Sequence, residues 1–433
     1  QPGAAQSSGS FHAIAEVFVP APRFTVISPM FNVARYLPEY FASLDAQTVP
    51  AGDIEIILVD DGSTDDTREL AEAFARDRAN VRVVGKANGG QASARNLGLE
   101  HATGDWVTFP DPDDVLGATY LADVAALMDT GDASVAMYTA RMLLWFEDDE
   151  SERAVRDVHA LGKRFENGTR HVDLDAEPEI VQAHVTTGFL RRALIEQHGL
   201  RFRESLRLRF EDGNFVTRYL LMAAVPRVGM VATADYLYRQ RSDASSTIQS
   251  SAADPRKYVD TVRYGYQDVV DAAEGRLPRW AQNLILYDLL WIFRSSTTAK
   301  MHRVRFPDAM HEEIHETLPR VLSHIDDDAI HAFRMMPVAD WMRDAVLLLK
   351  GEHRHGRPHF GAIDAKRGLA LVSYRYVGEP PAEEIRVGGE RVEPRFTKDW
   401  SHELLGRHIV WQRMLWVAAE GAVELTFDGQ PQR

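Results

Sequence analysis

Residues Asp105–Asp114 read DWVTFPDPDD, and these ten residues decide the fold predicted for the first half of the chain. The apolar run from Trp106 to Phe109 stops at a proline, which is typical of a buried strand and its end. Three carboxylates follow within four residues, namely Asp111, Asp113 and Asp114. Hard cations such as Mg²⁺ and Mn²⁺ take oxygen ligands, so the segment suits a divalent metal. The alternative is an acidic turn, because Asp and Pro are ordinary turn residues.

Strand and helix patterns alternate on the N-terminal side of this stretch. Apolar segments predict buried strands at 24–28, 54–59, 81–84 and 107–109, with helices at 35–47, through Leu70 and Phe74, and at 92–101. This alternation predicts a mostly parallel sheet flanked by helices. Ligands of such sheets bind at the carboxyl ends of the strands. Polar segments follow the four strands, so we expect them to converge at one edge: Pro29–Asn32, Asp60–Asp65, Asn88–Gln91 and Asp111–Asp114.

The remainder of the chain changes pattern twice. Residues 254–350 carry helical periodicity with many aromatics, and alternating segments split by Gly, Pro and Asp-Gly from about residue 358 predict a small β-sandwich. The expected organisation is a disordered or extended tail at 1–22, a catalytic α/β domain at 23–253, a helical region at 254–350 and a β-sandwich domain at 351–433. The chain ends soon after a strand, which leaves open that it is one portion of a longer protein.

Charge and composition restrict the possible functions. The net charge of −15 argues against a nucleic-acid partner, although local arginine clusters can still hold an anionic substrate. The chain has no cysteine, so thiolate nucleophiles and Cys-based zinc sites are excluded. No apolar stretch reaches the 18 or so residues of a membrane span. We therefore expect a cytoplasmic protein, at most associated with the inner face of the cell membrane.

The segment Val26–Leu116 closely resembles the inverting, nucleotide-sugar-dependent glycosyltransferases of family 2, which have the Rossmann-like GT-A fold. Five elements in the right order carry the resemblance: VISPMFN, VDDGSTDDT, NGGQASARNLGL, GDWVTFPDPDD and the later Glu211-Asp212 pair. Each motif alone is a weak signal, and their order and spacing make the match specific. The layout of the remaining chain is similar to that of glycosyltransferases that build or decorate wall teichoic acids and related polyol-phosphate polymers. This second resemblance rests on layout and not on a motif.

The resemblance implies a donor site at the strand ends. Asp60 or Asp61 would read uracil or a ribose hydroxyl, with capping of the following helix as the alternative. Pro29 and Asn32 would frame the same pocket, although Asn32 also suits a turn. Asn88 and Arg95 would reach the nucleotide or the diphosphate.

The family region that closes over the diphosphate would supply Arg239, Arg241 and Ser245. Here this region reads YRQRSDASS, without the Trp or His of the family's usual box. The departure puts these three residues in doubt as diphosphate ligands. It also argues against a processive cellulose- or hyaluronan-type synthase.

The resemblance divides the remaining chemistry among four carboxylates. Asp113 would bind Mn²⁺ or Mg²⁺ between the two phosphates, and Asp111 would contact the ribose or help to hold the metal. Asp212 would be the base that takes the proton from the acceptor hydroxyl, with Glu211 orienting the acceptor or an arginine. The alternative for this pair is that it only favours a helix N-terminus.

The predicted function is metal-dependent, inverting transfer of a hexosyl or N-acetylhexosaminyl group from a nucleotide sugar, with UDP the expected nucleotide. The expected acceptor is a hydroxyl of a cell-surface polymer such as teichoic acid or capsule. The C-terminal regions would bind the acceptor or mediate oligomerisation, and the protein would associate peripherally with a membrane-bound assembly. Alternatives are a lipid-linked oligosaccharide or protein acceptor, or an inactive carbohydrate-binding scaffold, against which the intact carboxylates argue.

Overall fold

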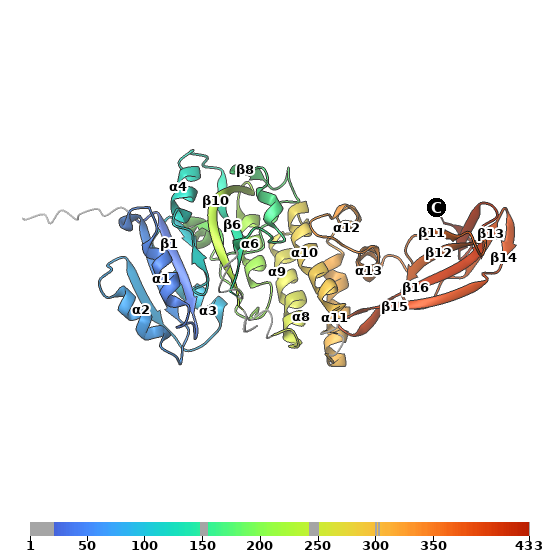
Figure 1. Ribbon diagram of the computed structural model, residues 1–433, viewed down its shortest axis with the longest axis horizontal. Helices are drawn as coiled ribbons and strands as arrows, with labels where there is room; N and C mark the ends of the chain where they lie inside the picture. The colour runs from blue at the N-terminus through green and yellow to red at the C-terminus, as the bar shows by residue number, and fades with distance from the viewer. Residues whose placement is uncertain (1–20, 148–154, 242–250, 299–300, 302–303, 433) are drawn as a thin grey trace, which may run out of the picture.

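The structure, a computed structural model, describes residues 21–147, 155–241, 251–298, 301 and 304–432. The elements follow one another along the long axis, with the large sheet at one end, a helical block in the middle and β-structure at the other end (Figure 1). Most of the expected N-terminal tail, residues 1–20, and the predicted site residue Ser245 lie outside the described residues.

Four parallel strands form the first half of the large sheet, in the order β3-β2-β1-β4. They are β1 (Phe24–Met30), β2 (Ile54–Asp60), β3 (Val81–Gly85) and β4 (Trp106–Thr108). The connecting elements are α1 (Leu37–Asp45), η1 (Ala51–Asp53), α2 (Thr67–Ala75) and α3 (Gln91–His101). Because parallel strands joined by helices put all their carboxyl ends at one edge, the four polar segments meet there as expected.

The second half of the sheet is mixed. Strand β9 pairs antiparallel with β4 and β6, β6 is parallel to β10, and β10 is antiparallel to β5. The strands are β5 (Val115–Leu116), β6 (Val135–Phe146), β7 (Val155–Arg156), β8 (Arg170–Asp173), β9 (Gly188–Arg191) and β10 (Arg227–Gln240). The helices are α4 (Tyr120–Met128), η2 (Gly162–Phe165), α5 (Arg192–Gln197) and α6 (Glu211–Met222). The predicted α/β fold class is confirmed, with antiparallel pairing beginning at β9.

Alternation along β1 places side chains in two cores, one on each face of the sheet. Every residue of β1 is buried, and Val26 belongs to the cluster that includes α1 while Ile27 belongs to the cluster that includes α3. A strand covered on both faces must be apolar on both faces, which is why these strands read as continuous apolar runs. Helix α3 packs closely because a Cβ at Gly98 would meet Ile27 Cγ2 at 2.2 Å.

The helical region shares its core with the large sheet. Tyr266, Leu284 and Phe293 belong to the same apolar cluster as Phe215 of α6. The helices are α8 (Arg256–Asp260), η3 (Thr261–Tyr266), α9 (Gln267–Ala272), α10 (Arg279–Ser296), α11 (Asp308–Leu322), α12 (Asp327–Ala332) and α13 (Asp340–Leu349). Among the described residues, no helix combines the length and the hydropathy needed to cross a bilayer.

The C-terminal part consists of two antiparallel sheets, as predicted. One has the order β11-β12-β16-β15 and the other the order β14-β13-β17-β18. The strands are β11 (His359–Asp364), β12 (Leu369–Tyr376), β13 (Glu383–Val387), β14 (Glu390–Val392), β15 (Phe396–Leu404), β16 (Arg407–Ala418), β17 (Val423–Phe427) and β18 (Gln430–Pro431). Val372 and Leu415 of one sheet pack against Leu425 and Phe427 of the other, so the two sheets share one small core.

Candidate functional site

Asn32 ties the loop after β1 to the loop after β2. Its backbone has a left-handed φ of 52°, a conformation that Asn tolerates better than most residues. The Asn32 N–H donates to Ser63 Oγ at 3.1 Å, and Thr64 N–H donates to Asn32 Oδ1 at 2.8 Å. Pro29 is buried next to Val59 near the end of β1. Both residues therefore lie at the carboxyl edge of the sheet, and the turn alternative for Asn32 agrees with its geometry.

The neighbouring aspartates Asp60 and Asp61 have different surroundings. Asp61 accepts hydrogen bonds from Gly89 N at 2.9 Å and Gly90 N at 2.7 Å, and from Lys86 Nζ at 2.7 Å. It therefore holds the glycine-rich loop in place. Asp60 accepts from Ser63 N at 3.0 Å through Oδ1, while its Oδ2 lies 4.0 Å from the Arg68 guanidinium. Neither side chain caps α2, so the capping alternative does not apply.

The glycine-rich loop brings backbone close to the strand ends. Gly62 has a φ of 76°, and a Cβ on it would lie 2.9 Å from Asn88 N. Gly90, with a φ of 92°, immediately precedes the eleven-residue helix α3. The Asn88 side chain is exposed beside this helix start. Free N–H groups at a helix N-terminus favour anions, so this loop suits a phosphate.

Arg95 joins the two groups of carboxylates. Its Nη1 donates to Asp212 Oδ1 at 2.6 Å and its Nη2 donates to Asp111 Oδ1 at 3.1 Å. The side chain is 1% exposed and lies over the Phe202 ring, with Cζ 5.4 Å from the ring centroid. The charges of Asp212 and Asp111 outweigh the burial and raise the pKa of Arg95 above its ordinary value. Arg95 is thus a buried, permanently charged bridge between Asp111, 16 positions further along the chain, and Asp212, 117 positions further.

Asp114 is buried, unlike Asp111 and Asp113, and its carboxylate is hydrogen-bonded to β10. It is 1% exposed, and it accepts from Tyr236 Oη at 2.6 Å and from Arg239 N at 2.8 Å. The Tyr236 Oη in turn accepts from Asp111 N at 3.0 Å. Burial raises the pKa of Asp114 well above its ordinary value. The contacts of Asp114 are thus with the fold, and it faces away from solvent.

Two arginines at the end of β10 contact the acidic segment. Arg241 directs Nε and Nη2 to Asp113 Oδ2, at 3.0 and 2.6 Å. Arg239 donates to Glu39 at 2.6 Å, to Glu147 at 2.8 Å and to the Asp113 carbonyl oxygen at 2.5 Å. The Arg239 guanidinium is therefore hydrogen-bonded to other protein groups, whereas Arg241 pairs with Asp113, the aspartate expected to hold the metal.

Helix α6 presents Glu211 and Asp212 at its first turn. The preceding Phe210 has a left-handed φ of 65°, a strained conformation of the kind found at functional sites. Asp212 accepts from Arg95 through Oδ1 and from Val185 N at 3.1 Å through Oδ2, so both oxygens are held. Burial, and then the charge of Asp212, raise the pKa of Glu211 to about 7. Glu211 can thus carry a proton near neutral pH.

The carboxylates after β4 fit a divalent cation. Burial raises the pKa of Asp111 to about 7 despite Arg95, with the charges of Asp113 and Asp212 adding to the effect. The charge of Arg95 thus does not fully offset the burial of Asp111, and a metal ion would supply further positive charge there. Within the described residues the Arg241 fork uses only one oxygen of Asp113. Mg²⁺-type ions need only one or two protein carboxylates when phosphates provide the other ligands.

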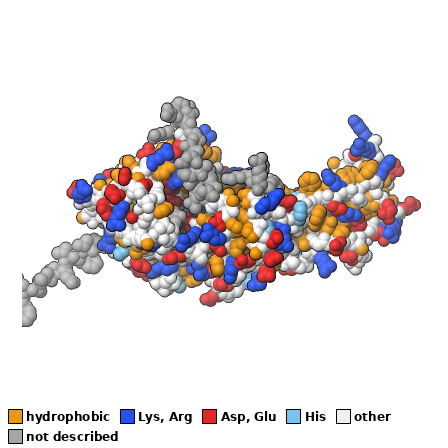
Figure 2. All heavy atoms as spheres, turned by 90° about the horizontal axis from the view of Figure 1, so that it is seen from below, with side chains coloured by type: hydrophobic (Ala, Val, Ile, Leu, Met, Phe, Trp, Pro, Cys, Tyr) orange, Lys and Arg blue, Asp and Glu red, His pale blue; other side chains and the backbone are white. Residues whose placement is uncertain are grey.

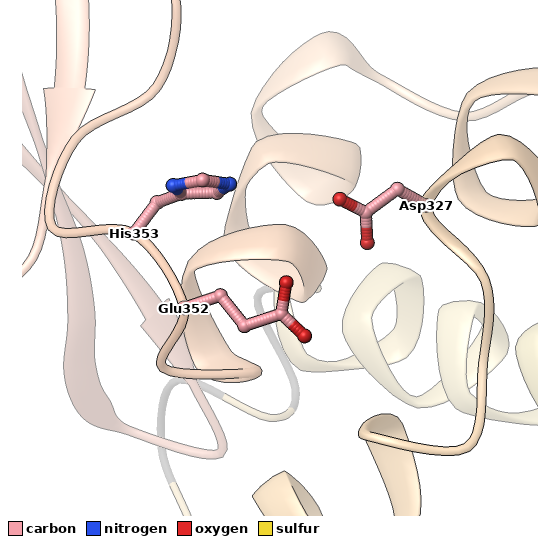
Figure 3. A group of neighbouring side chains, drawn as sticks. All are labelled: Asp327, Glu352 and His353. Carbon is pink, nitrogen blue, oxygen red and sulfur yellow. The ribbon is translucent and has the colours of Figure 1, made fainter.

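A second acidic group, far from these residues in the fold, is a poorer metal site. Asp327, Glu352 and His353 face one another, with possible ligand atoms within 4.8 Å of one another (Figure 3). The Lys350 ammonium contacts Asp327 and lies 3.5 Å from Glu352 Oε1. The Lys350 side chain is only 6% exposed, and its charge offsets one of the two negative charges of this cluster.

The raised pKa of Asp111 predicts how metal-free stability varies with pH. Its folded value of about 7 exceeds the unfolded value of 3.8, so the folded state binds more protons between these limits. The contribution of Asp111 to stability therefore falls as pH rises from about 4 to about 7. Without metal, we expect Asp111→Asn to melt at a higher temperature than the wild type above pH 7, and at the same temperature below pH 4. The control is Asp77→Asn, at an exposed position. A melting temperature of Asp111→Asn below that of the wild type at pH 8 would contradict the raised pKa of Asp111.

Several residues of this site carry no signal that points to them in the sequence. Gln91 Nε2 donates to Asp111 Oδ1 at 2.6 Å, and Gln91 lies inside the NGGQ motif without an expected role. Tyr236 and Glu39 come from apolar or helical segments with no motif. Val185 contributes only its backbone N–H, which no sequence pattern reveals.

Residues 25–198 match the sequence profile described as glycosyl transferase family 2. The minor teichoic acid biosynthesis protein GgaB of Bacillus subtilis (strain 168) is 29% identical over 311 residues, which is 71% of this chain and 33% of that protein. The poly(ribitol-phosphate) beta-N-acetylglucosaminyltransferase TarS of Staphylococcus aureus (strain MW2) is 26% identical over 401 residues, or 88% of this chain and 64% of TarS. The chain therefore spans between a third and two thirds of the length of these relatives.

Solved structures share the fold. The crystal structure of S. aureus TarS 1–349 in complex with UDP-GlcNAc superposes with a TM-score of 0.58 at 21% identity, covering 76% of this chain and 87% of that one. The longer crystal structure of S. aureus TarS gives a TM-score of 0.56 at 16% identity, covering 95% of this chain and 77% of that one. The likeness therefore extends beyond the large sheet into the C-terminal part.

Proposed function

We propose that this chain, whose residues 25–198 form a family 2 glycosyltransferase domain, moves one sugar from a UDP-sugar to a hydroxyl of a polyol-phosphate polymer, with inversion. The observation that carries the proposal is the Arg95 bridge. It holds Asp111, at the metal end of the site, and Asp212, a base candidate, to one guanidinium at 3.1 and 2.6 Å. A site that must act on both ends of one transferred sugar needs these two groups at a fixed separation.

The donor would lie along the carboxyl ends of β1 to β3. Asp60 is the better candidate for the base or ribose, since among the described residues the contact of its Oδ2 is with Arg68 at 4.0 Å, whereas Asp61 is held by the glycine-rich loop. The start of α3 and the exposed Asn88 would face the diphosphate. UDP-GlcNAc, the compound in the TarS 1–349 complex, is the first donor to test.

Asp113, with Asp111, would hold Mn²⁺ or Mg²⁺. When bound, the ion would neutralise charge on the departing nucleoside diphosphate. Arg241 would have to leave Asp113 Oδ2 for that oxygen to bind the ion, and its guanidinium would then turn toward a phosphate. Asp113 would thus pair with Arg241 before the donor enters and hold the ion afterwards.

Asp212 would take the proton of the acceptor hydroxyl. Arg95 and Val185 N fix its carboxylate, and inversion requires one such base on the acceptor side of the sugar. Glu211, which can hold a proton near pH 7, would donate a hydrogen bond to the acceptor. The proposed acceptor class is that of its relatives GgaB, a minor teichoic acid biosynthesis protein, and TarS, a poly(ribitol-phosphate) transferase. We propose that the reaction takes place in the cytoplasm, at the inner face of the membrane.

A donor screen tests the proposal. Purified protein with UDP-GlcNAc, other UDP-sugars and poly(ribitol phosphate) should release UDP and transfer sugar to the polymer from one donor, and EDTA should abolish both. Asp113→Asn should lower the rate by about 10²-fold or more, as expected for losing charge stabilisation of the leaving group. Asp77→Asn, at an exposed position on the same domain, is the control. Full transfer in EDTA, or by Asp113→Asn, would contradict the metal assignment.

A further inference from the structure

A groove lined by arginines lies beside the Arg95 bridge. It is open, has a volume of about 470 Å³, and is lined by Arg201, Arg203 and Arg218 together with Gly199, Phe202 and Glu204. Phe202, one of the lining residues, stacks face to face on Phe215, with 3.8 Å between the ring centroids. The Arg95 guanidinium also contacts the Phe202 ring, with Cζ 5.4 Å from the centroid, so Phe202 belongs both to the groove and to the surroundings of the Arg95 bridge.

The groove carries more positive charge than its acidic neighbours neutralise. Within the described residues, Arg201 donates only to the Leu200 carbonyl oxygen, and Arg218 donates to Asn214 Oδ1 and the Arg201 carbonyl oxygen. Neither has a carboxylate partner there, whereas Arg203 pairs with Asp268. Burial lowers the pKa of Arg218, and repulsion from Arg203 adds to this effect, while the charge of Asp268 opposes it. The three arginines of the groove thus outnumber Glu204 and Asp268.

This local excess contrasts with the whole chain. The net charge is −15, and basic side chains gather in groups among acidic ones on the face seen from below (Figure 2). The segment from Arg201 to Arg209 nevertheless places four arginines in nine residues. Arg209 is paired with Asp288 and Arg203 with Asp268, which leaves the exposed Arg201 and Arg207 without a carboxylate partner among the described residues.

The same segment leads from the groove to the donor end of the site. Arg207 is exposed, and a Cβ on Gly90 would lie 3.8 Å from Arg207 Cδ. On the other side, α6 carries Asp212 in its first turn and Arg218 six residues later, about 9 Å along the helix axis. A chain that presents one hydroxyl at Asp212 could thus reach the groove with a neighbouring repeat.

We propose that this groove binds phosphodiester groups of the acceptor polymer, one or more repeats away from the hydroxyl that receives the sugar. The inference rests on the proposed function, because it assumes an acceptor with one negative charge per repeat. Arginine forks match phosphate oxygens, and helix α6, which carries both Asp212 and Arg218, links the groove to the site. The groove would select charged polymers over neutral glycans and favour long chains over single repeats.

The test compares Arg201→Glu with wild type and with Arg76→Glu, a matched charge reversal at an exposed position on α2's C-terminal side. Arg201 is exposed and Arg218 contacts only its backbone carbonyl, so the substitution keeps that contact and loses the Arg201 hydrogen bond to the neighbouring Leu200 carbonyl oxygen. Binding of fluorescently labelled poly(ribitol phosphate) is measured by anisotropy, at low and at high salt, with neutral dextran as the negative control. We expect at least five-fold weaker binding for Arg201→Glu, a shallower salt dependence, and no change for Arg76→Glu.

Transfer kinetics separate this inference from the function on which it rests. A raised KM for the polymer, with a smaller effect on a single-repeat acceptor, supports the groove. If no UDP-sugar is used but Arg201→Glu still loses polymer binding, the groove stands and the transferase proposal fails. If the wild type transfers sugar to the polymer and Arg201→Glu binds the polymer equally tightly, the groove inference is overturned.

Discussion

Asp212→Asn is expected to lower the turnover of sugar transfer by about 10²–10⁴-fold, the contribution of a general base. Asparagine keeps an acceptor oxygen for Arg95 Nη1, which Asp212 Oδ1 contacts at 2.6 Å, but it cannot take the acceptor proton. Binding of UDP-GlcNAc and metal, measured by calorimetry, should change little because the donor contacts lie at the strand ends. The loss should therefore appear in kcat rather than in donor affinity.

Glu211→Gln is the matched control for Asp212→Asn. It alters the neighbouring carboxyl, whose pKa is about 7, without touching the Arg95 bridge. We expect a smaller loss, seen mainly as a change in the pH profile between pH 6 and 8. If Glu211→Gln abolished turnover and Asp212→Asn retained it, the base would be Glu211 and the assignment would be wrong.

Arg95→Met is expected to reduce stability and activity together. The Arg95 side chain is 1% exposed, and its loss leaves Asp111 and Asp212, each about one fifth exposed, without their shared counter-charge. Removing one partner of such a buried pair costs roughly 3 kcal/mol. Activity should fall further in Arg95→Met than in Asp111→Asn, because Arg95→Met removes the contact of both Asp111 and Asp212 with the guanidinium.

A double-mutant cycle distinguishes the bridge from general destabilisation. Asp111→Asn in the Arg95→Met background removes one uncompensated charge, so the double variant should unfold at higher denaturant than Arg95→Met alone. Arg95→Lys should recover only part of the stability, since one ammonium cannot make both contacts of the guanidinium fork. Strictly additive effects of the two substitutions would contradict the bridge.

The strands and their polar ends could be predicted because their chemistry is local. Strand β1 is buried on both faces, which forces a continuous apolar run, and the motifs follow directly after β1 to β4. The antiparallel pairing of β9 with β4 could not be predicted, since the sequence of Gly188–Arg191 does not differ from that of any other short apolar segment. Pairing direction there depends on how residues far apart in the sequence pack.

The partners of the site arginines could not be predicted either. The motif gives Arg95 a place on α3, but its partner Asp212 at the start of α6 is 117 positions away, and only the tertiary fold brings the two side chains together. Likewise, the expectation for Arg239 was a diphosphate contact, whereas its guanidinium is paired with Glu39 and Glu147. Sequence motifs identified the edge of the sheet, and tertiary packing determined which charges meet there.

A crystal structure with UDP-GlcNAc and Mn²⁺ is the most direct test of the proposed site. The proposal predicts an anomalous manganese peak within about 2.3 Å of an Asp113 carboxylate oxygen, with the uracil near Asp60 and Arg241 turned away from Asp113 onto the diphosphate. The anomeric carbon should face Asp212. A manganese peak found only at Asp327, Glu352 and His353, or a nucleotide bound away from the ends of β1 to β4, would contradict it.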